Sequence, residues 1–283
     1  MEDKTIIGVD LGGTNIRVGK IYNDKVTDLY TRQISSTGTE QKVIYEIITS
    51  IKKIFNNSIL GIGVGVPSVV DVEKGIVYDV QNIPAFRKVY LKDILEKEFK
   101  VPVYINNDAN CFVVGEKYFG AGKNYKDIVG LILGTGLGSG IYTNDKLYMG
   151  ANCGAGEFGM ISYKDSNYEG YCCGQFFIKK NNTTGEDIYR KAVNGDNDAL
   201  EIFNEFGYHV GNAISAIVLS VDPEIIILGG SVSKAYDYFK NSLNIALDTF
   251  PYQNSIKRLK IVVSKLKQVS ILGAAALYFE NKK

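Results

Sequence analysis

The stretch from Thr5 to Tyr22 reads TIIGVDLGGTNIRVGKIY, and the stretch from Asp127 to Tyr148 reads DIVGLILGTGLGSGIYTNDKLY. Each begins with apolar, largely β-branched residues typical of a strand, passes through a turn of glycine and threonine, and ends in another strand. Glycines in such a turn admit backbone conformations with positive φ and bring N–H groups close to an anion. The repeated pattern predicts two related halves that each hold part of a phosphate-bearing ligand.

The two hairpins align without a gap, but they differ in charge. Asp10 in the first hairpin falls on Ile132 in the second, whereas both copies keep their glycines. An acid at the end of a strand beside a glycine turn is suited to hold Mg²⁺ through water, because Mg²⁺ binds a few carboxylates together with substrate phosphates. One half is therefore predicted to supply a charge, as in a two-lobed phosphotransferase. The alternative is a plain hairpin with a turn aspartate, and the duplication argues against it.

The composition is that of an ordinary globular protein. Its 283 residues exceed the usual limit for one hydrophobic core, so two lobes are expected. The net charge of +1 and the lack of a long Lys/Arg run predict that nucleic acid is not a partner. No apolar stretch approaches the roughly 18 residues of a membrane helix, and the N-terminus shows no signal peptide, so we expect a cytoplasmic protein that does not bind membranes. Reduced thiols are predicted for Cys111, Cys153, Cys172 and Cys173, which include an adjacent pair and no CxxC.

Strand and helix patterns alternate along the chain, which indicates an α/β protein. We expect the chain to cross between lobes near Asn107 and near Gln268, which gives a smaller lobe of residues 1–107 plus 268–283 and a larger lobe of residues 108–267. Residues 150–184 are polar and without a regular pattern, so they are predicted to be loop-like. Besides the second hairpin, the expected strands cover residues 5–9, 16–22, 29–34, 59–67, 101–106, 224–228 and 259–263, and the expected helices cover residues 40–55, 91–99, 109–119, 199–221, 238–249 and 270–279.

The segment INNDAN, Ile105 to Asn110, carries the candidate catalytic group. It follows a predicted strand, and open α/β sheets place their ligands at the carboxyl ends of strands. Asp108 can accept a proton from a substrate hydroxyl as that oxygen attacks the terminal phosphorus of a nucleotide. The alternative is that Asn107 or Asp108 only caps the following helix, because Asn and Asp are favoured at helix starts. Both roles can hold together.

Three other segments are candidates for ligand binding. LGTGLGSG, Leu133 to Gly140, is the second glycine turn, and its Thr135 hydroxyl is the best candidate to contact phosphate. It matches neither the dinucleotide fingerprint nor a P-loop. ILGGSVS, Ile227 to Ser233, follows a buried strand, where an adenine ring can lie against bare backbone, although a strand-to-helix turn explains it equally well. GANCGAGEFGM, Gly150 to Met160, is either a loop whose Glu157 bridges two hydroxyls of a polyol or a surface loop.

In their order along the chain these segments resemble the ROK family (repressor, open reading frame, kinase) of sugar kinases, which has the two-lobed actin/hexokinase-like ATPase fold, a ribonuclease-H-like α/β fold. The likeness covers nearly the whole chain and rests on DLGGTNIR, GVGVPSVVD, INNDANCFVVGE, LGTGLGSGI, GAGEFG, ILGGSVS and SILGAAAL. The resemblance implies that Asp108 is the general base and that Asn107, Gly156 and Glu157 bind the sugar. It also implies that Asp10 holds Mg²⁺ through water and that MgATP is bound by Asp10, Gly12, Gly13, Thr14, Asn15, Gly134, Thr135, Gly136, Gly229 and Gly230.

The chain departs from the family pattern where relatives bind zinc. The histidine that usually ends the sugar loop is replaced by Met160. Of the family segment Cys-x-Cys-Gly-x-x-Gly-Cys-x-Glu, which aligns without a gap on residues 171–180, only Cys173 and Gly174 remain. One thiolate cannot close a tetrahedral site that needs four ligands, so we predict no structural zinc. The last sugar-binding glutamate of the family falls on Lys180, which leaves open what replaces that contact.

The expected function is that of an ATP-dependent hexose kinase that uses Mg²⁺ and phosphorylates the 6-hydroxyl of a hexose, with glucose as the first candidate. An N-acetylhexosamine kinase acting on N-acetylmannosamine or N-acetylglucosamine is the main alternative, and allose and fructose kinases stay open. A sugar-responsive repressor would need a DNA-binding module ahead of the first phosphate motif, for which the chain leaves no room before Asp10. A catalytically silent sugar sensor is the other alternative, and the presence of Asp108 argues against it. The resemblance also implies a homodimer.

Overall fold

The computed structural model describes residues 4–80 and 82–282, so both ends of the predicted smaller lobe, residues 1–3 and 283, lie outside the described residues, as does residue 81. The chain forms two compact units. The first comprises the residues up to Asn124, Lys146–Ala155 and the residues from Lys265 onward, and the second comprises Tyr125–Asp145 and Gly156–Ser264. Residues 108–124 and 146–155 thus group with the first unit, whereas the sequence placed them in the larger lobe. The packing of helix α3 (Asp108–Phe119) against helix α10 (Val269–Glu280) explains much of this difference.

The first unit is built on a five-stranded sheet with the order β3-β2-β1-β4-β8. Strand β2 is antiparallel to both of its neighbours, β1 and β3, whereas β4 and β8 run parallel to β1. The same unit also contains a separate three-stranded sheet with the order β5-β6-β7. The elements of this unit are β1 (Thr5–Leu11), β2 (Asn15–Tyr22), β3 (Lys25–Gln33), α1 (Glu40–Lys52), β4 (Ile59–Val66), β5 (Val69–Asp71), β6 (Ile76–Tyr78), β7 (Lys88–Val89), α2 (Leu91–Phe99), β8 (Val103–Asn107), α3 (Asp108–Phe119), β11 (Lys146–Tyr148) and α10 (Val269–Glu280).

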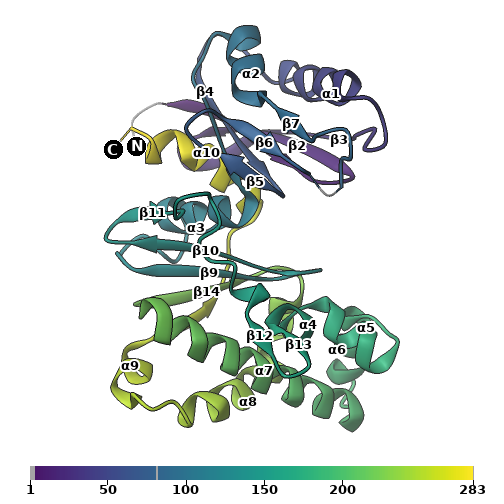
Figure 1. The fold of residues 1–283 in the computed structure, drawn as a ribbon, viewed down its shortest axis with the longest axis vertical. Coiled ribbons are helices and arrows are strands. Elements are labelled where there is room, and N and C mark those ends of the chain that lie inside the picture. The colour runs from purple at the N-terminus through teal and green to yellow at the C-terminus, as the bar shows by residue number, and fades with distance from the viewer. Residues whose placement is uncertain (1–3, 81, 283) are drawn as a thin grey trace. The chain divides into compact units, whose positions relative to one another are not determined.

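Alternating side chains of β1 face two different helix layers. Ile7 and Val9 pack into a buried cluster with apolar residues of α1 and α2. Ile6 instead packs with residues of α10, which covers the opposite face (Figure 1). A β carbon built on Gly8 would lie 2.1 Å from the carbonyl oxygen of Ile271, so this helix rests directly on the sheet backbone. The period-2 pattern of β1 therefore places Asp10, two residues after Gly8, on the side of the sheet that α10 covers.

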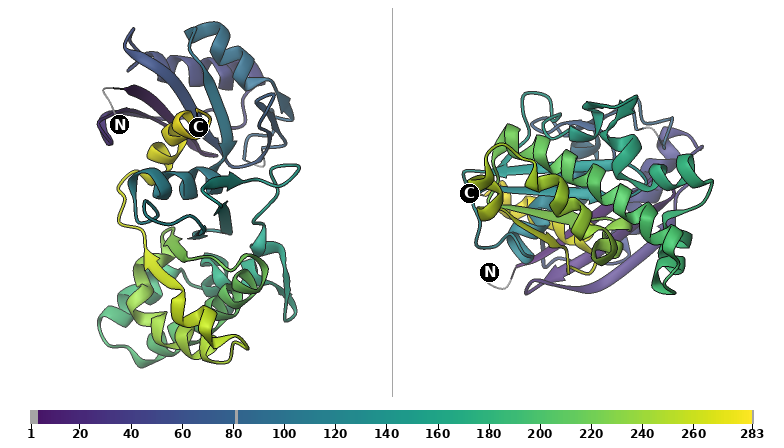
Figure 2. Two further views of the ribbon diagram at one scale, coloured as in Figure 1. Left: turned by 90° about the vertical axis from the view of Figure 1, so that its left-hand side faces the viewer. Right: turned by 90° about the horizontal axis from the view of Figure 1, so that it is seen from below.

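The second unit repeats part of this plan. Its sheet has the order β10-β9-β14-β15, with β9 and β10 antiparallel and both β14 and β15 parallel to β9. These are the same pairings as in β2-β1-β4-β8, which supports the duplication inferred from the sequence. Helices α7 and α8 lie side by side (Figures 1 and 2). The elements are β9 (Ile128–Leu133), β10 (Leu137–Thr143), η1 (Phe158–Met160), β12 (Ser162–Tyr163), β13 (Ser166–Asn167), α4 (Tyr168–Cys172), α5 (Gly174–Asn181), α6 (Gly185–Val193), α7 (Asn197–Val221), β14 (Ile225–Gly229), η2 (Val232–Ala235), α8 (Tyr236–Asp248), α9 (Gln253–Arg258) and β15 (Lys260–Val263).

The two hairpins differ in the length of their turns. Leu11 pairs with Ile16 in the first hairpin, whereas Leu133 pairs with Leu137 in the second. The second turn is therefore one residue shorter, and the gapless alignment is wrong beyond the first glycine of the turn. The strands on either side still pair in the same way, because the residue that the second turn lacks lies between the paired positions. The alternation of side chains along the strands is therefore the same in both hairpins.

The prediction that residues 150–184 are loop-like is wrong for much of that stretch. It contains η1, the short hairpin β12–β13 and the helices α4 and α5. These elements are too short to show a period, and their order comes from aromatic side chains, such as Tyr168, Phe176 and Phe177, which are buried in the unit. Helix α6 also had no clear signal in the sequence.

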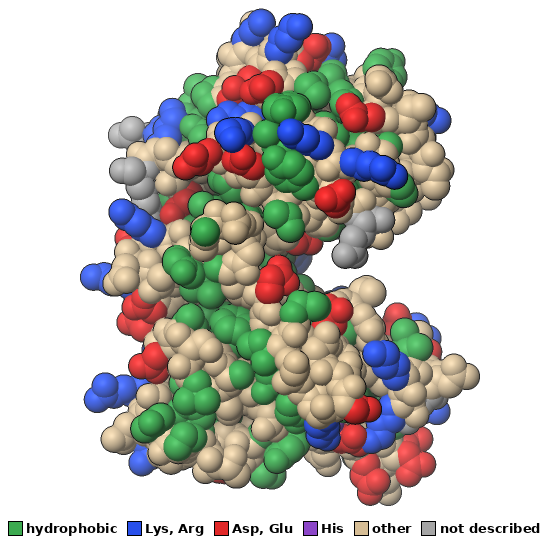
Figure 3. Space-filling view, in the orientation of Figure 1, with side chains coloured by type: hydrophobic (Ala, Val, Ile, Leu, Met, Phe, Trp, Pro, Cys, Tyr) green, Lys and Arg blue, Asp and Glu red, His purple; other side chains and the backbone are tan. Residues whose placement is uncertain are grey.

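Charged side chains of both signs are interspersed on the face drawn in Figure 3, without an extended patch of one sign. Within residues 4–80 and 82–282, no helix combines the length and the hydropathy needed to cross a membrane.

Candidate functional site

Asp108 and Asn107 stand at the junction of β8 and α3 in the first unit. Asp108 is the first residue of α3 and is exposed, whereas Asn107 is the N-cap and is half-buried. The Oδ1 atom of Asn107 accepts a hydrogen bond from the backbone N–H of Ala109 at 2.8 Å. Its Nδ2 atom donates to the carbonyl oxygen of Ser68 at 3.3 Å. The capping role proposed as an alternative therefore belongs to Asn107, and Asp108 does not have to fill it.

The buried side chain of Asn106 forms hydrogen bonds that hold this junction. Oδ1 of Asn106 accepts from the backbone N–H of Asn107 at 2.9 Å and from Nδ2 of Asn110 at 2.9 Å. The same oxygen lies 3.4 Å from the thiol of Cys153, and Nδ2 of Asn106 lies 3.1 Å from the sulfur of Met149. Because a buried amide is held at several points, the backbone that carries Asn107 and Asp108 is well fixed.

The first glycine turn presents its acid on the same unit. Asp10 is the last residue but one of β1 and forms an ion pair with Arg17, its cross-strand neighbour on β2. The guanidinium of Arg17 also donates to the hydroxyl of Ser270 at 3.2 Å, at the start of α10. A carboxylate held in this way is oriented at the mouth of the turn. The predicted turn residues Gly12 and Gly13 are half-buried, and Thr14 and Asn15 are exposed. The N–H of Gly12 donates to the carbonyl oxygen of Asn15 at 2.9 Å, which closes the turn.

In the second unit the two predicted nucleotide segments meet. A β carbon on Gly230, whose φ is +84°, would lie 2.3 Å from the carbonyl oxygen of Leu133 and 3.0 Å from the backbone nitrogen of Gly134. The GGS turn after β14, which begins at the buried Gly229, thus touches the turn formed by Gly134, Thr135 and Gly136. This approach is possible only for glycine, because any side chain there would overlap backbone atoms.

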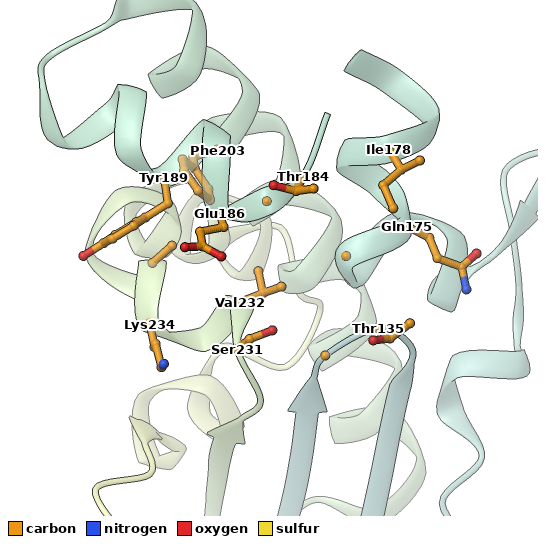
Figure 4. Close-up of a pocket in the computed structure, with 14 residues that line it drawn as sticks. Thr135, Gln175, Ile178, Thr184, Glu186, Tyr189, Phe203, Ser231, Val232 and Lys234 are labelled. Atoms are coloured by element: carbon orange, nitrogen blue, oxygen red, sulfur yellow. The ribbon is translucent and has the colours of Figure 1, made fainter. Parts of the chain in front are cut away.

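A pocket of roughly 490 Å³ opens where these turns meet (Figure 4). Gly134 and Thr135 form one wall, and Ser231, which follows the GGS glycines, forms another. Helices α5 and α6 supply most of the remaining wall, and the sequence did not predict their part in it. Val232 belongs to the predicted segment ILGGSVS, whereas the lining residues outside any predicted nucleotide segment are Gly174, Gln175, Ile178, Thr184, Gly185, Glu186, Tyr189, Phe203, Lys234 and Ala235.

The pocket combines an apolar side with polar groups at its edge. Ile178, Tyr189 and Phe203 offer the flat or apolar surface that a purine ring needs, and the hydroxyl of Thr135 lies at the glycine turn (Figure 4). Helix α5 is tied to the turn, because the backbone N–H of Gly174 donates to the carbonyl oxygen of Gly134 at 2.8 Å. An apolar wall beside a glycine turn is the combination that a nucleotide site needs, with the wall for the base and the glycine backbone for the phosphates.

Two carboxylates lie together elsewhere in the second unit. Glu157 precedes η1 and is exposed, yet partial desolvation of its carboxyl raises its pKa, and the charge of Glu169 raises it further. Glu169 lies in the first turn of α4, and its Oε2 accepts from the backbone N–H of Leu137 at 3.0 Å. Gly156 has φ of +91°, and its carbonyl oxygen accepts from the hydroxyl of Ser139, which fixes the loop before Glu157. Paired acids of this kind suit a polyol, because carboxylate oxygens can accept hydrogen bonds from its hydroxyl groups.

Lys180 occupies the position at which the sequence left the last sugar contact open. That residue lies on α5, where its ammonium group forms an ion pair with Glu205 and lies 5.7 Å from the ring centre of Phe176. The acid that accompanies Glu157 is Glu169, eleven positions earlier. The sequence did not single out Glu169, and only the short helix α4 shows that this acid points back to the glycine turn.

The four cysteines are not joined by disulfides, and all of them belong to the described part of the chain. Burial raises the pKa of Cys172 well above its usual value and that of Cys173 to about 11, so both thiols keep their protons at neutral pH. Among the described residues, no three His, Cys, Asp or Glu side chains are grouped as metal ligands. That the protein holds no structural zinc stays a prediction.

Comparison with known proteins agrees with the geometry of both units. A glucokinase of Thermotoga maritima is 30% identical over 98% of this chain and 98% of its own length, and a beta-glucoside kinase of Listeria monocytogenes is 26% identical over the same shares. A crystal structure of a ROK family glucokinase from Streptomyces griseus in complex with glucose and AMPPNP has a TM-score of 0.80 and 26% identity, over 96% of this chain and 98% of that one. The predicted actin/hexokinase-like ATPase fold is thereby confirmed. The profile of the ROK family matches residues 6–281, and the chain belongs to that family.

Proposed function

We propose that this ATP-dependent sugar kinase of the ROK family transfers the γ-phosphate of ATP to the 6-hydroxyl of a hexose, with glucose as the first candidate. The observation that carries the proposal is the pocket at the second glycine turn, which joins two segments whose glycine patterns predict nucleotide binding. An exposed aspartate at the carboxyl end of a parallel strand supplies the base that such a transfer needs.

In this proposal Asp108 accepts the proton of the sugar hydroxyl as its oxygen attacks phosphorus. The carboxylate of Asp108 is not needed as the N-cap of α3, because the side chain of Asn107 fills that role. Asn107 itself is held by Ser68 and by the backbone of Ala109, so it is oriented to contact a sugar hydroxyl. A positioned base of this kind contributes a factor of about 10²–10⁴ to the rate.

The phosphates are assigned to the two glycine turns, whose backbone N–H groups stabilise the charge that develops during transfer. Asp10 is the residue assigned to Mg²⁺, since it is a half-buried carboxylate beside a turn and Mg²⁺ prefers such oxygens. The ion pair with Arg17 orients this carboxylate. When bound with ATP, Mg²⁺ neutralises charge on the phosphate oxygens.

We assign the acceptor sugar's contacts in the second unit to Glu157 and Glu169. Glu169→Gln is expected to raise the KM for the sugar about tenfold or more, because a charged acceptor of a hydroxyl hydrogen bond is replaced by a neutral one. The substitution also removes the charge that raises the pKa of Glu157. Glu157 would then ionise at lower pH, so the acidic limb of the kcat/KM profile should move to lower pH. Steady-state kinetics between pH 5 and 8 measure both effects.

Lys180→Ala is the matched control for this prediction, since the sequence placed the family's sugar-binding acid at that position. It breaks the exposed ion pair with Glu205 and the contact with Phe176, and it removes one of the charges that lower the pKa of His209. We expect the sugar KM of this variant to stay within twofold of wild type. A rise for Lys180→Ala that equals the rise for Glu169→Gln would contradict the assignment of Glu169.

A coupled assay of ADP release tests the proposed function directly. Glucose, mannose, fructose, N-acetylglucosamine, N-acetylmannosamine and a β-glucoside such as cellobiose form the panel, and we expect glucose to give the highest kcat/KM. A preference of tenfold or more for N-acetylmannosamine would replace glucose by the alternative acceptor, and a preference for cellobiose would favour the activity named for the Listeria relative. Sugar binding without ADP release on any member of the panel would identify a silent sensor instead.

A further inference from the structure

The β12–β13 hairpin lies in sequence between the two acids assigned to the sugar. Glu157 precedes it by one turn of 3-10 helix, and Glu169 follows it in the first turn of α4. Only two residue pairs join its strands. A two-stranded hairpin of this size is not stable by itself in water. Contacts with the rest of the second unit must therefore hold it in place.

Those contacts come from aromatic side chains that anchor the hairpin on α7. The hydroxyl of Tyr163 lies 3.1 Å from Nδ1 of His209. The Tyr163 ring stacks on Tyr168 at 4.5 Å between centroids and meets Tyr171 edge-on at 5.4 Å. Tyr168 in turn donates its hydroxyl hydrogen to the carbonyl oxygen of Asn212 at 3.3 Å. The hairpin and the start of α4 are thus fastened to the same stretch of α7.

The direction of the bond between Tyr163 and His209 follows from the charges around it. Burial raises the pKa of Tyr163 to about 12, so its phenol is protonated at neutral pH. Burial, together with the charges of Lys164 and Lys180, lowers the pKa of His209 to about 4, so the imidazole is neutral. Its Nε2 atom lies 3.6 Å from a carboxylate oxygen of Glu205, which favours the hydrogen on that nitrogen. Nδ1 is then the acceptor, and Tyr163 donates to it.

The opposite side of α4 is held by the glycine turn. Oε2 of Glu169 accepts from the backbone N–H of Leu137 at 3.0 Å, and Oε1 lies 3.5 Å from Nε2 of Gln175. A β carbon on Gly136 would lie 2.6 Å from Oε2, so the carboxylate occupies the space that a side chain there would fill. The orientation of Glu169 therefore depends on two anchors, the turn on one side and the aromatic contacts on the other.

We propose that Tyr163 and His209 are positioning residues for the acceptor sugar, and that their hydrogen bond holds Glu157 and Glu169 in the arrangement that binds it. This inference rests on the proposed function, in which those two acids contact the sugar. Loss of the bond frees the hairpin from α7 and lets both acids move, so sugar binding weakens. The nucleotide pocket contains neither Tyr163 nor His209, so the binding of ATP is expected to stay as it is.

Tyr163→Phe removes the hydroxyl and keeps the ring, which makes it the decisive variant. We expect the KM for the best sugar of the panel to rise about five- to tenfold, the range for one buried hydrogen bond. The kcat should stay within threefold and the KM for ATP within twofold of wild type. His209→Leu should give the same split, and His209→Asn, which keeps an acceptor near the place of Nδ1, should give a smaller rise. Combining Tyr163→Phe with His209→Leu should add little, because both remove one bond.

Tyr125→Phe is the matched control, since it deletes a tyrosine hydroxyl of the same unit, bonded to Nζ of Lys260 at 2.7 Å. Both KM values should stay unchanged in this variant. A sugar KM that is unchanged in Tyr163→Phe, or a rise of both KM values together, would overturn the positioning role. If His209→Leu does not fold, Tyr163→Phe and His209→Asn decide the question, with melting temperatures as a check. A wild-type protein that phosphorylates no sugar would refute the proposed function instead, which is a different outcome.

Discussion

Asp108→Asn should lower kcat by a factor of about 10²–10⁴ while ATP binding is largely kept. An amide cannot accept the proton that leaves the sugar hydroxyl, so the transfer loses its base. The fold should tolerate this change, because the side chain of Asn107 caps α3 and an amide oxygen can still accept from the N–H of Ala109, as Oδ1 of Asp108 does at 2.8 Å. Hexose-dependent ADP release and equilibrium binding of an ATP analogue measure the two parts of the prediction.

Asp237→Asn is the matched control for this change. Asp237 is also an exposed acid in the first turn of a helix, α8, where it pairs with Lys240 at 2.8 Å. The same loss of one negative charge at a helix start should leave kcat within twofold of wild type, because an exposed pair of this kind contributes little. ADP release by Asp108→Asn within tenfold of wild type would show that Asp108 is not the base.

The sequence alone predicted those features that depend on local pattern. Strand alternation and glycine turns revealed both hairpins, and the same signals located β8 and the start of α3 with Asn107 and Asp108 at their junction. These features follow from backbone requirements that a few neighbouring residues satisfy, such as the glycine at Gly230 that allows the two turns of the second unit to touch. The α/β class followed from the alternation of strand and helix patterns, and the actin/hexokinase-like fold followed from the resemblance to the ROK family.

What the sequence could not predict depends on packing between distant segments. The pocket wall from α5 and α6 is assembled from residues such as Ile178 and Tyr189, which have no local signature of ligand binding. Glu169 was missed for a similar reason, because its role depends on a five-residue helix whose direction is set by aromatic contacts with α7. The boundary between units also differed, since the packing of α3 against α10 joins parts of the chain far apart in sequence.

Gly63→Ala should lower the stability of the first unit by about 3 kcal/mol or more, the upper range for inserting a carbon into a filled core. A β carbon at Gly63 would lie 1.8 Å from the carbonyl oxygen of Ala274 and 3.3 Å from the backbone nitrogen of Ala275. Both neighbours are backbone atoms of α10, so no side-chain rotation can make room. The helix must move away from the sheet as a whole, and its buried residues, Ile271 among them, would lose contacts with β1 and β4.

Scanning calorimetry and hydrogen exchange together measure this effect. A loss of about 3 kcal/mol corresponds to a melting temperature lower by roughly 6–12 °C in a domain of this size. Exchange should rise first in peptides of β1, β4 and α10, whose contact is strained, while β9 and β14 of the second unit keep their protection. Gly154→Ala is the control, because a β carbon there meets nothing within 4 Å, and its melting temperature should stay within about 1 °C of wild type. A Gly63→Ala protein as stable as this control would show that α10 does not rest on the sheet backbone as described. The placement of Ser270, at the start of α10, beside Arg17 and Asp10 would then also be wrong.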